Sequence, residues 1–235
     1  ATTTDNTFAV DGVVLTDMAA VGGSATYFDF GAYEEVQLTT ASTDVTIQTA
    51  GVTINQVTKR GTNEWRGDGR YLRTEGSWQS EPEEADGNRI DSVEEWGANF
   101  GGPLWKDHLW AWASYGESDI GNVAQGGQLD RTQLEDLNSK LNFQFGGNSG
   151  VVHFWTNDKL KNGRNAGPLF APESTWDQTT PQDIWKIEDT QIFGNNFYVN
   201  GLYSRDDGSF TLTPKGGLDA DMFIDEDGVV HGSYF

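Results

Sequence analysis

The sequence predicts an all-β chain that forms part of a large antiparallel transmembrane β-barrel, with a small globular piece before it. Three observations lead to this prediction. After residue 63, apolar and polar residues alternate over segments of about ten residues, which is the period of a strand with two different faces. The connections between these segments are alternately short and long. No apolar run approaches the roughly 20 residues that a transmembrane helix requires.

The composition limits the class of partner. The 235 residues include 36 acidic and 15 basic ones, which gives a net charge of −21, and the mean hydropathy is −0.57. Such acidity argues against nucleic acid as a partner, because phosphate would be repelled. Low hydropathy is compatible with a membrane barrel, since only alternate residues face lipid. The aromatic content (9 Trp, 13 Phe and 7 Tyr) suits the aromatic belts of such barrels, although a soluble β-sandwich with a Trp-rich core is an alternative.

The chain shows little sign of catalytic or metal chemistry. Cysteine is absent, and His108, His153 and His231 are scattered, so no metal triad or nucleophile–His–Asp set is indicated. We expect no enzyme activity. Asp225 and Asp227 are weak candidates for Ca²⁺ ligands, because oxygen-rich loops bind calcium. Their spacing does not match an EF-hand loop, so a solvated anionic surface is the alternative and no other cofactor is expected.

Residues 1–61 are expected to form the globular piece. Asp11-Gly12 predicts a turn, followed by a short buried strand at 13–15. Residues 33–40 alternate, and 53–58 is a β-branched strand. The polar residues that follow are predicted to be the junction with the barrel: Lys59, Arg60, Gly61, Thr62 and Asn63.

Residues 62–235 are expected to supply about seven barrel strands. Their predicted ranges are 62–75, 93–104, 108–119, 134–146, 150–160, 183–193 and 196–206. The fourth has the clearest pattern, with Leu137, Leu141 and Phe143 on one face and Asn138 and Lys140 on the other. The third is apolar on both faces at 109–113, which packing against the globular piece would explain.

The expected connections at 105–107, 146–149 and 194–195 are tight, whereas those at 76–92, 120–133 and 161–182 are long and polar. This segregation is typical of outer-membrane barrels, which have short periplasmic turns and long extracellular loops. Trp78 and Trp176 fall in expected outer loops, where they could stack on a sugar or peptide ligand or simply pack the loop. An open sheet would leave two unpaired edges in lipid, so we expect a fragment of a larger barrel.

The same residues carry a family resemblance. TINQVTKRGTNEWRGDGRY (53–71) resembles the end of the plug and the first barrel strand of TonB-dependent outer-membrane receptors. FAVDGVVLTD (8–17) and FDFGAYEEVQLTT (28–40) resemble plug segments. GANFGGPLWKDHLWAWASYG (97–116) resembles the second and third barrel strands, and KNGRNAGP (161–168) a loop after the fifth. The most similar subgroup is the Oar-like one, whose members usually carry an N-terminal carboxypeptidase-regulatory-like domain.

The resemblance implies a plugged barrel of about 22 strands in the bacterial outer membrane, surrounded by lipid and lipopolysaccharide. The small α/β plug would lie in the lumen, and its start, the signal sequence, the TonB-contacting segment and most of the barrel would lie outside these residues. A ligand would bind at the outer loops and plug, and enter when the TonB–ExbB–ExbD complex displaces the plug. The ligand is open between siderophore, oligosaccharide, peptide and protein. A non-transporting scaffold for secretion, adhesion or surface assembly is the alternative.

Overall fold

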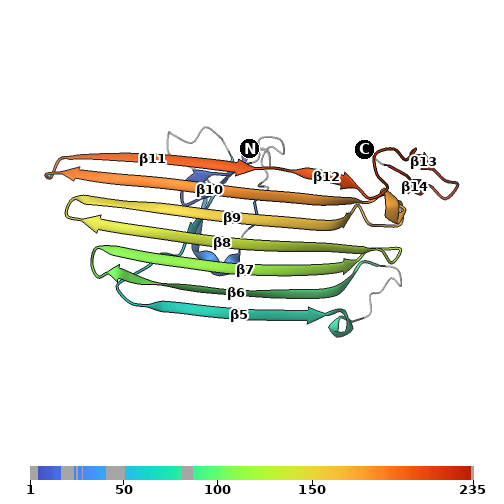
Figure 1. Ribbon diagram of the computed structural model, residues 1–235, viewed down its shortest axis with the longest axis horizontal. Coiled ribbons are helices and arrows are strands. Elements are labelled where there is room, and N and C mark those ends of the chain that lie inside the picture. Colours follow the sequence, from blue (N-terminus) through green and yellow to red (C-terminus); the bar gives the residue numbers. More distant parts are fainter. Residues whose placement is uncertain are drawn as a thin grey trace.

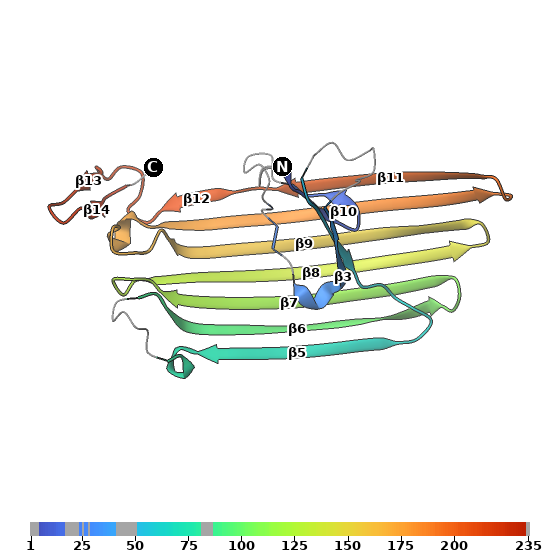
Figure 2. The ribbon, with the colours of Figure 1, turned by 180° about the vertical axis from the view of Figure 1, so that it is seen from behind.

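The fold consists of one large antiparallel sheet, one small sheet packed on one of its faces, and a separate two-stranded pair. It is seen in a computed structural model that describes residues 5–16, 24, 26–27, 29–40, 51–80 and 87–233. Figures 1 and 2 show the large sheet from its two sides, with the small sheet behind it in Figure 1 and in front of it in Figure 2. We call the face that meets the small sheet the inner face and the opposite one the outer face.

Seven strands of the large sheet follow one another in space in the order of the sequence. They are β5 (Arg66–Glu75), β6 (Arg89–Trp105), β7 (Leu109–Val123), β8 (Leu129–Phe145), β9 (Asn148–Arg164), β10 (Trp176–Phe193) and β11 (Phe197–Gly208). β12 (Thr211–Pro214) continues the line of β11 and pairs with β10 beyond a two-residue break. Every neighbouring pair is antiparallel, as in a meander.

The predicted strands are therefore confirmed, but most are longer than expected. The short turns at one end, which we call the short-turn end, comprise residues 106–108, 146–147 and 194–196. At the other end, the loop end, the prediction of long connections was wrong in two places: 120–133 shrinks to 124–128, and 161–182 shrinks to 165–175. The strands continue beyond the apolar pattern because backbone pairing does not require apolar side chains. β5, by contrast, begins at Arg66 rather than at 62, because Thr62 and Glu64 hydrogen-bond within a local turn.

The small sheet contains β1 (Thr7–Val10), β2 (Val13–Val14), β3 (Tyr33–Thr39) and β4 (Thr53–Thr58), in the order β2-β1-β4-β3. β1 and β4 are parallel, and the other two pairs are antiparallel. A 3₁₀ turn, η2 (Phe30–Ala32), precedes β3 and lies against the inner face. Apolar side chains from both sheets share one core: Val10, Val13, Leu15, Trp155 and Ile184.

Shorter elements lie at the loop end. They are η3 (Gly76–Trp78), η4 (Pro172–Ser174) and the two-stranded pair β13 (Phe223–Ile224) and β14 (Val230–His231). The β13–β14 pair rests on the 165–175 connection through backbone hydrogen bonds between Ala171 and Val230 and between Val230 and Leu169. Among the described residues, no helix is long and apolar enough to cross a membrane.

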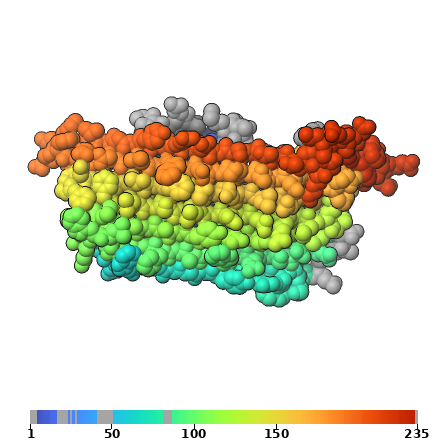
Figure 3. Space-filling view, in the orientation of Figure 1, coloured from blue at the N-terminus to red at the C-terminus, as the bar shows by residue number. Residues whose placement is uncertain are grey.

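The outer face carries a band of exposed apolar side chains. Figure 3 shows this face, with the strands side by side across it. Leu137, Leu141 and Phe143 lie on this face, while Asn138 and Lys140 face inward and are buried, as predicted. Aromatic residues border the band on both sides. Those toward the loop end are Tyr71, Trp96, Tyr115, Trp185 and Tyr203, and those toward the short-turn end are Trp105, Phe145, Phe193 and Phe197.

The boundary between this band and charged residues runs obliquely to the strand register. The last apolar residues are Trp96 on β6, Leu137 on β8, Trp185 on β10 and Tyr203 on β11. Trp96 of β6 lies opposite Glu117 of β7, and Glu117 lies opposite Glu135 of β8. The boundary on β8 is at Leu137, which is two residues closer to the short-turn end than Glu135. The boundary lies a further two residues toward the short-turn end on β10, and two more on β11. A shift of about one residue per strand, with a rise of ~3.3 Å and a strand spacing of ~4.8 Å, corresponds to a tilt of about 35°, as in closed barrels.

Candidate functional site

The small sheet is attached to the inner face by buried polar contacts rather than by apolar packing alone. The most extensive is the Asp11 cluster, which we define as Asp11, Thr58, Lys140, His153 and Lys186. Asp11 and Thr58 belong to the small sheet, and the three basic residues stand on β8, β9 and β10. This group was not identified from the sequence, because its members are separated by up to 175 positions.

The local backbone explains why Asp11 points at the inner face. Asp11 and Gly12 form the turn between β1 and β2 and both have positive φ, 47° and 80°, a conformation that Asp and Gly tolerate better than other residues. The Asp11 carboxylate accepts hydrogen bonds from the Thr58 amide at 3.2 Å and the Thr58 hydroxyl at 2.6 Å. The turn is thereby fixed to the end of β4, and its carboxylate is oriented before it meets the large sheet.

The large sheet presents three bases to this one turn. Lys140 Nζ lies 2.8 Å from Asp11 Oδ2 and donates to the Thr58 carbonyl at 3.1 Å. His153 Nδ1 lies 3.2 Å from the same carboxylate oxygen. Lys186 Nζ donates to the main-chain oxygen of Asp11 at 2.6 Å and pairs with Glu188 at 2.7 Å. One turn of the small sheet thus contacts three consecutive strands.

The charged groups of the cluster lie in a buried setting. Lys140, His153 and Lys186 are 7%, 4% and 6% exposed. Burial alone would raise the pKa of the Asp11 carboxyl, but the hydrogen bond with His153 and the positive charge of Lys140 outweigh burial and hold that pKa well below its usual range. Asp11 is therefore an anion at any physiological pH.

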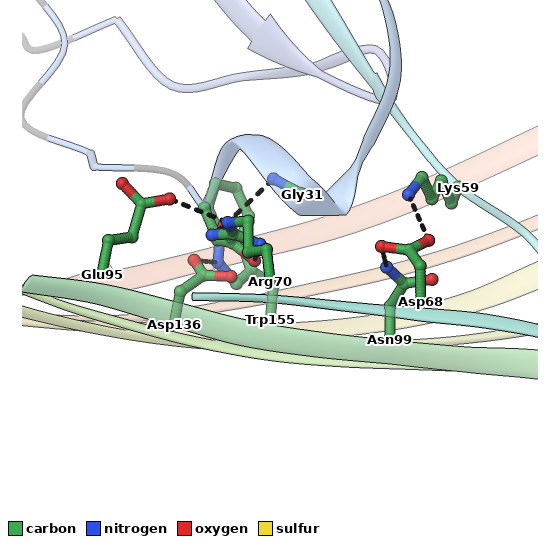
Figure 4. A network of polar contacts seen from close by, with 9 residues as sticks. Gly31, Lys59, Asp68, Arg70, Glu95, Asn99, Asp136 and Trp155 are labelled. Carbon is green, nitrogen blue, oxygen red and sulfur yellow. Dashed lines mark hydrogen bonds and ion pairs between the residues drawn. The ribbon is translucent and has the colours of Figure 1, made fainter. Parts of the chain in front are cut away.

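A second buried contact joins η2 to β5 and β6 (Figure 4). Asp29 caps η2 by accepting from the Gly31 amide at 3.0 Å, and its carboxylate also receives both terminal guanidinium nitrogens of Arg70. Arg70 Nε donates to Glu95 at 2.8 Å. The Asp29 side chain is only 3% exposed, so this forked ion pair is shielded from water.

Glycines make that close approach possible. Gly97 and Gly116 are cross-strand partners on β6 and β7, in register with Arg70. A Cβ at Gly116 would lie 2.6 Å from Asp29 Cγ, and one at Gly97 would lie 2.8 Å from an Arg70 nitrogen. Both are closer than real Cβ contacts allow, so the two glycines leave the space that Asp29 and Arg70 occupy.

The residues predicted to form the junction lie between β4 and β5, at the short-turn end. Lys59 pairs with Asp68 of β5 at 3.2 Å, and Asp68 accepts from Asn99 at 2.8 Å (Figure 4). Asn63 bonds with the side chain and amide of Asp107, in the first short turn, and accepts from the Trp110 indole at 2.7 Å. Arg60 and Thr62 line cavities, and Gly61 lies against the backbone of β7.

Two cavities open on the inner face of the large sheet, one beside the small sheet and one beside residues 60–63. The first, about 960 Å³, contains all five members of the Asp11 cluster in its lining, together with Asp68 and Trp112. The second, about 440 Å³, lies nearer the short turns and is lined by Gln144, Ser149 and Thr190 among others. Both include Arg60, Thr62, Asn142 and Val151 in their lining, so they adjoin.

The two tryptophans proposed as ligand contacts lie at the loop end but in different settings. Trp78 is the last residue of η3 and is 67% exposed. Trp176 does not lie in a loop, contrary to the prediction, because it is the first residue of β10 and pairs with Pro214 of β12. The backbone pairing of β10 extends beyond the apolar segment that the sequence reveals, so the strand includes a position expected to be outside it.

The calcium candidates belong to the β13–β14 pair. Asp225 Oδ1 accepts from the amides of Asp227 and Val229, both at 2.9 Å, and Asp225 Oδ2 lies 3.0 Å from His231 Nε2. Asp225 therefore already serves as a turn cap and an ion-pair partner. Within the described residues, no three His, Asp or Glu side chains gather as metal ligands would, and calcium binding stays a prediction.

Comparison with known proteins supports the architecture. No family model and no curated protein matches the sequence. Among solved structures, the chain is similar to the siderophore receptor PirA from Acinetobacter baumannii, with a TM-score of 0.56 and 14% sequence identity. The match covers 95% of this chain and 38% of that receptor, so the chain spans about two fifths of its length. In its fold, this chain is an all-β protein with an antiparallel sheet similar to that of a β-barrel receptor.

Proposed function

We propose that this chain is the end of the plug (1–61) and the first seven strands (62–235) of a TonB-dependent outer-membrane receptor that imports an extracellular ligand. One observation carries the proposal: a small sheet is held by buried ion pairs on the polar inner face of a tilted sheet, whose outer face is an apolar band between aromatic belts. A polar inner and apolar outer face is the arrangement of a barrel that separates lipid from a filled lumen.

The dimensions of the band support a membrane location. On β8 the band extends from Leu137 to Phe145, eight steps of ~3.3 Å, or about 26 Å along the strand. At a tilt of about 35° its height is about 22 Å, close to the ~25 Å apolar band of outer-membrane barrels. In this proposal the short turns face the periplasm, and the loop end, with Trp78, faces outward toward lipopolysaccharide and the ligand.

The edges of the sheet support a larger barrel. Within the described ranges, β5 and β11 each pair with one neighbour only, and unpaired backbone groups cost several kcal/mol each in hydrocarbon. We infer that further strands close the sheet into a barrel of about 22 strands. Membership of the Oar-like subgroup rests on the sequence resemblance described above.

The contacts of the small sheet suit a gate. An apolar interface would have to expose its surface to the lumen on opening, whereas ionic and amide groups can exchange partners with water or solute. We propose that the TonB–ExbB–ExbD complex supplies the work that separates Asp11 and Asp29 from the wall. Neither catalysis nor a cofactor is part of this function.

A disulfide between the small sheet and the wall tests the gate. The chain has no cysteine, so Asp29→Cys/Gly116→Cys would contain the only pair. The Cβ of Asp29 lies 3.0 Å from where a Cβ at Gly116 would be, slightly below the usual disulfide separation of about 3.5–4.5 Å. The ligand is first identified by mass spectrometry of the purified receptor, and its uptake is then measured in cells.

We expect uptake to require TonB, to stop when the disulfide forms and to return on reduction to the level of the same variant kept reduced, with each single-cysteine variant treated with oxidant as the control. Undiminished uptake with the disulfide formed would refute a gate at this contact. A surface function that persists both without TonB and with the disulfide formed would favour the scaffold alternative.

A further inference from the structure

We propose that Lys140, His153 and Lys186 form an anion-binding site on the inner wall, which Asp11 occupies in place of the carboxylate or phosphate of a solute. In the closed state the plug thus carries its own substitute for the anion. The site becomes available when the small sheet withdraws.

The register of β8, β9 and β10 aligns the three bases. Lys140 pairs with His153, and His153 pairs with Lys186, so the three bases are direct cross-strand neighbours in one row of the inner face. Side chains at such positions have Cβ atoms about 4.5–5.5 Å apart, and like charges placed there repel one another. A row of three bases is therefore unfavourable unless an anion lies against it.

The partners of the row show how that anion is supplied. Asp11 contributes a carboxylate to Lys140 and His153 and a carbonyl to Lys186. The wall itself provides only Glu188, for Lys186, and the Asn138 amide oxygen, 2.7 Å from His153 Nε2. Removing Asp11 would leave Lys140 without a carboxylate partner. Lys140 is buried, so water could not replace that partner while the small sheet stays in place. Without the Asp11 carboxylate, the wall has too little negative charge to neutralise its bases.

The space around the row fits a small solute. The cavity of about 960 Å³ lies next to all three bases and adjoins the second cavity toward the short turns. Arg60 lines both cavities and, within the described part of the chain, has no hydrogen-bond or ion-pair partner. An anion leaving the row toward the short turns would next meet this free guanidinium. Guanidinium groups bind carboxylate and phosphate in a forked geometry.

The chemistry of the row defines the ligand class. Two ammonium groups and one imidazole surround one carboxylate oxygen and one carbonyl oxygen, so the occupant needs at least two acceptor oxygens and a negative charge. Carboxylates and phosphates meet both conditions. The inference uses the plug-and-wall arrangement of the proposed function but not transport, because binding is measured without any energy source.

Asp11→Asn tests the site, because it removes the negative charge of the Asp11 side chain while keeping its shape. In the complete protein purified in detergent, we expect inorganic phosphate or acetate to raise the unfolding temperature of Asp11→Asn saturably and to leave the wild type unchanged. Adding Lys140→Met should weaken this response roughly tenfold or more, because a hydrogen bond to a charged group is lost. A response to phosphate alone or to acetate alone identifies which oxyanion the row prefers.

Asp130→Asn is the matched control. Asp130 pairs with Lys161 on the inner face of β8 and β9, so this change frees one lysine that has no row of bases beside it. An equal anion response in Asp130→Asn, or none in Asp11→Asn, overturns the proposal. If Asp11→Asn does not fold, refolding yield with and without phosphate replaces the unfolding temperature, and equal yields overturn it likewise. Failure of uptake in the disulfide experiment leaves these results unaffected.

Discussion

Lys186 of β10 donates a hydrogen bond from Nζ to the main-chain oxygen of Asp11, 2.6 Å away, although 175 positions separate the two residues. The bond connects the turn of the small sheet to the sixth strand of the large one. Together with the Lys140 and His153 contacts, it makes Asp11 the point at which the small sheet is held most firmly. The predictions below test this contact and the surfaces around it.

Asp11→Ala should loosen the small sheet. The change leaves Lys140 and His153 buried without their carboxylate, and removing one partner of a buried ion pair costs about 3–5 kcal/mol. Hydrogen exchange of the β4 amides should accelerate accordingly. Asp207→Ala is the control, because its pair with Arg205 is exposed and such pairs contribute about 0–1 kcal/mol. Equal exchange rates in the two variants would contradict a structural role for Asp11.

Gly116→Ala should displace η2 from the wall. Its methyl group would lie 2.6 Å from Asp29 Cγ, so either the ion pair with Arg70 or the backbone must shift, and overpacking of this kind costs about 1–3 kcal/mol. The Asp29 side chain accepts a hydrogen bond from the Gly31 amide, so the hydrogen-exchange rate of that amide should rise if η2 shifts. Gly201→Ala serves as control, since a Cβ there meets nothing within 4 Å. An unchanged hydrogen-exchange rate of the Gly31 amide in Gly116→Ala would show that the approach of Asp29 to β7 is not sterically limited.

Leu141→Arg should impair insertion into a bilayer. Leu141 lies on the outer face in the middle of the apolar band, where an arginine costs about 2–4 kcal/mol. Glu135→Arg is the matched change on the same strand and face, beyond the band, and should insert normally because water is available there. The measurement is the folded fraction in lipid vesicles. Similar folding of both variants would argue against a membrane around this band.

His231 should titrate above the ordinary histidine range. Hydrogen bonds to Asp225 and then to Glu173 raise the pKa of His231, because both carboxylates favour the imidazolium. A raised folded pKa means that the stabilisation is complete below the unfolded value of about 6.5 and is lost as the pH rises through the folded one. NMR titration should show this shift, and Asp225→Asn should reduce it. A pKa at or below the ordinary value would refute the contact.

The seven strands could be predicted because alternation is a local property. The Leu137–Phe145 segment of β8 shows its two faces in nine consecutive residues, and burial alternates with them from Leu137 to Leu141. The loop-end halves of the strands could not be predicted in the same way. From Asp130 to Gln133, polar residues occupy both faces of β8, and the backbone bonds to β7 and β9 define the strand there. Trp176 was misplaced for the same reason.

The composition changes abruptly between Thr58 and Trp65, which is why the sequence marks a connection there, whereas the Asp11 cluster was missed. Nothing in the sequence around Lys140 or Lys186 differs from an ordinary polar strand face. One signal was available: both lysines, and His153, occupy inward positions of their strands, where a charge needs a partner. Only the packing of the small sheet on the inner face identifies that partner.

By itself, the sequence determined that this chain is an all-β meander with one polar and one apolar face, because side-chain period and turn residues act over a few positions. The tertiary structure decided which polar groups meet. Strand register set three bases in one row, and the turn of the small sheet brought the Asp11 carboxylate to them. The physical reason is that an ion pair depends on distance in space, which residues far apart in the chain acquire only when the sheets have formed.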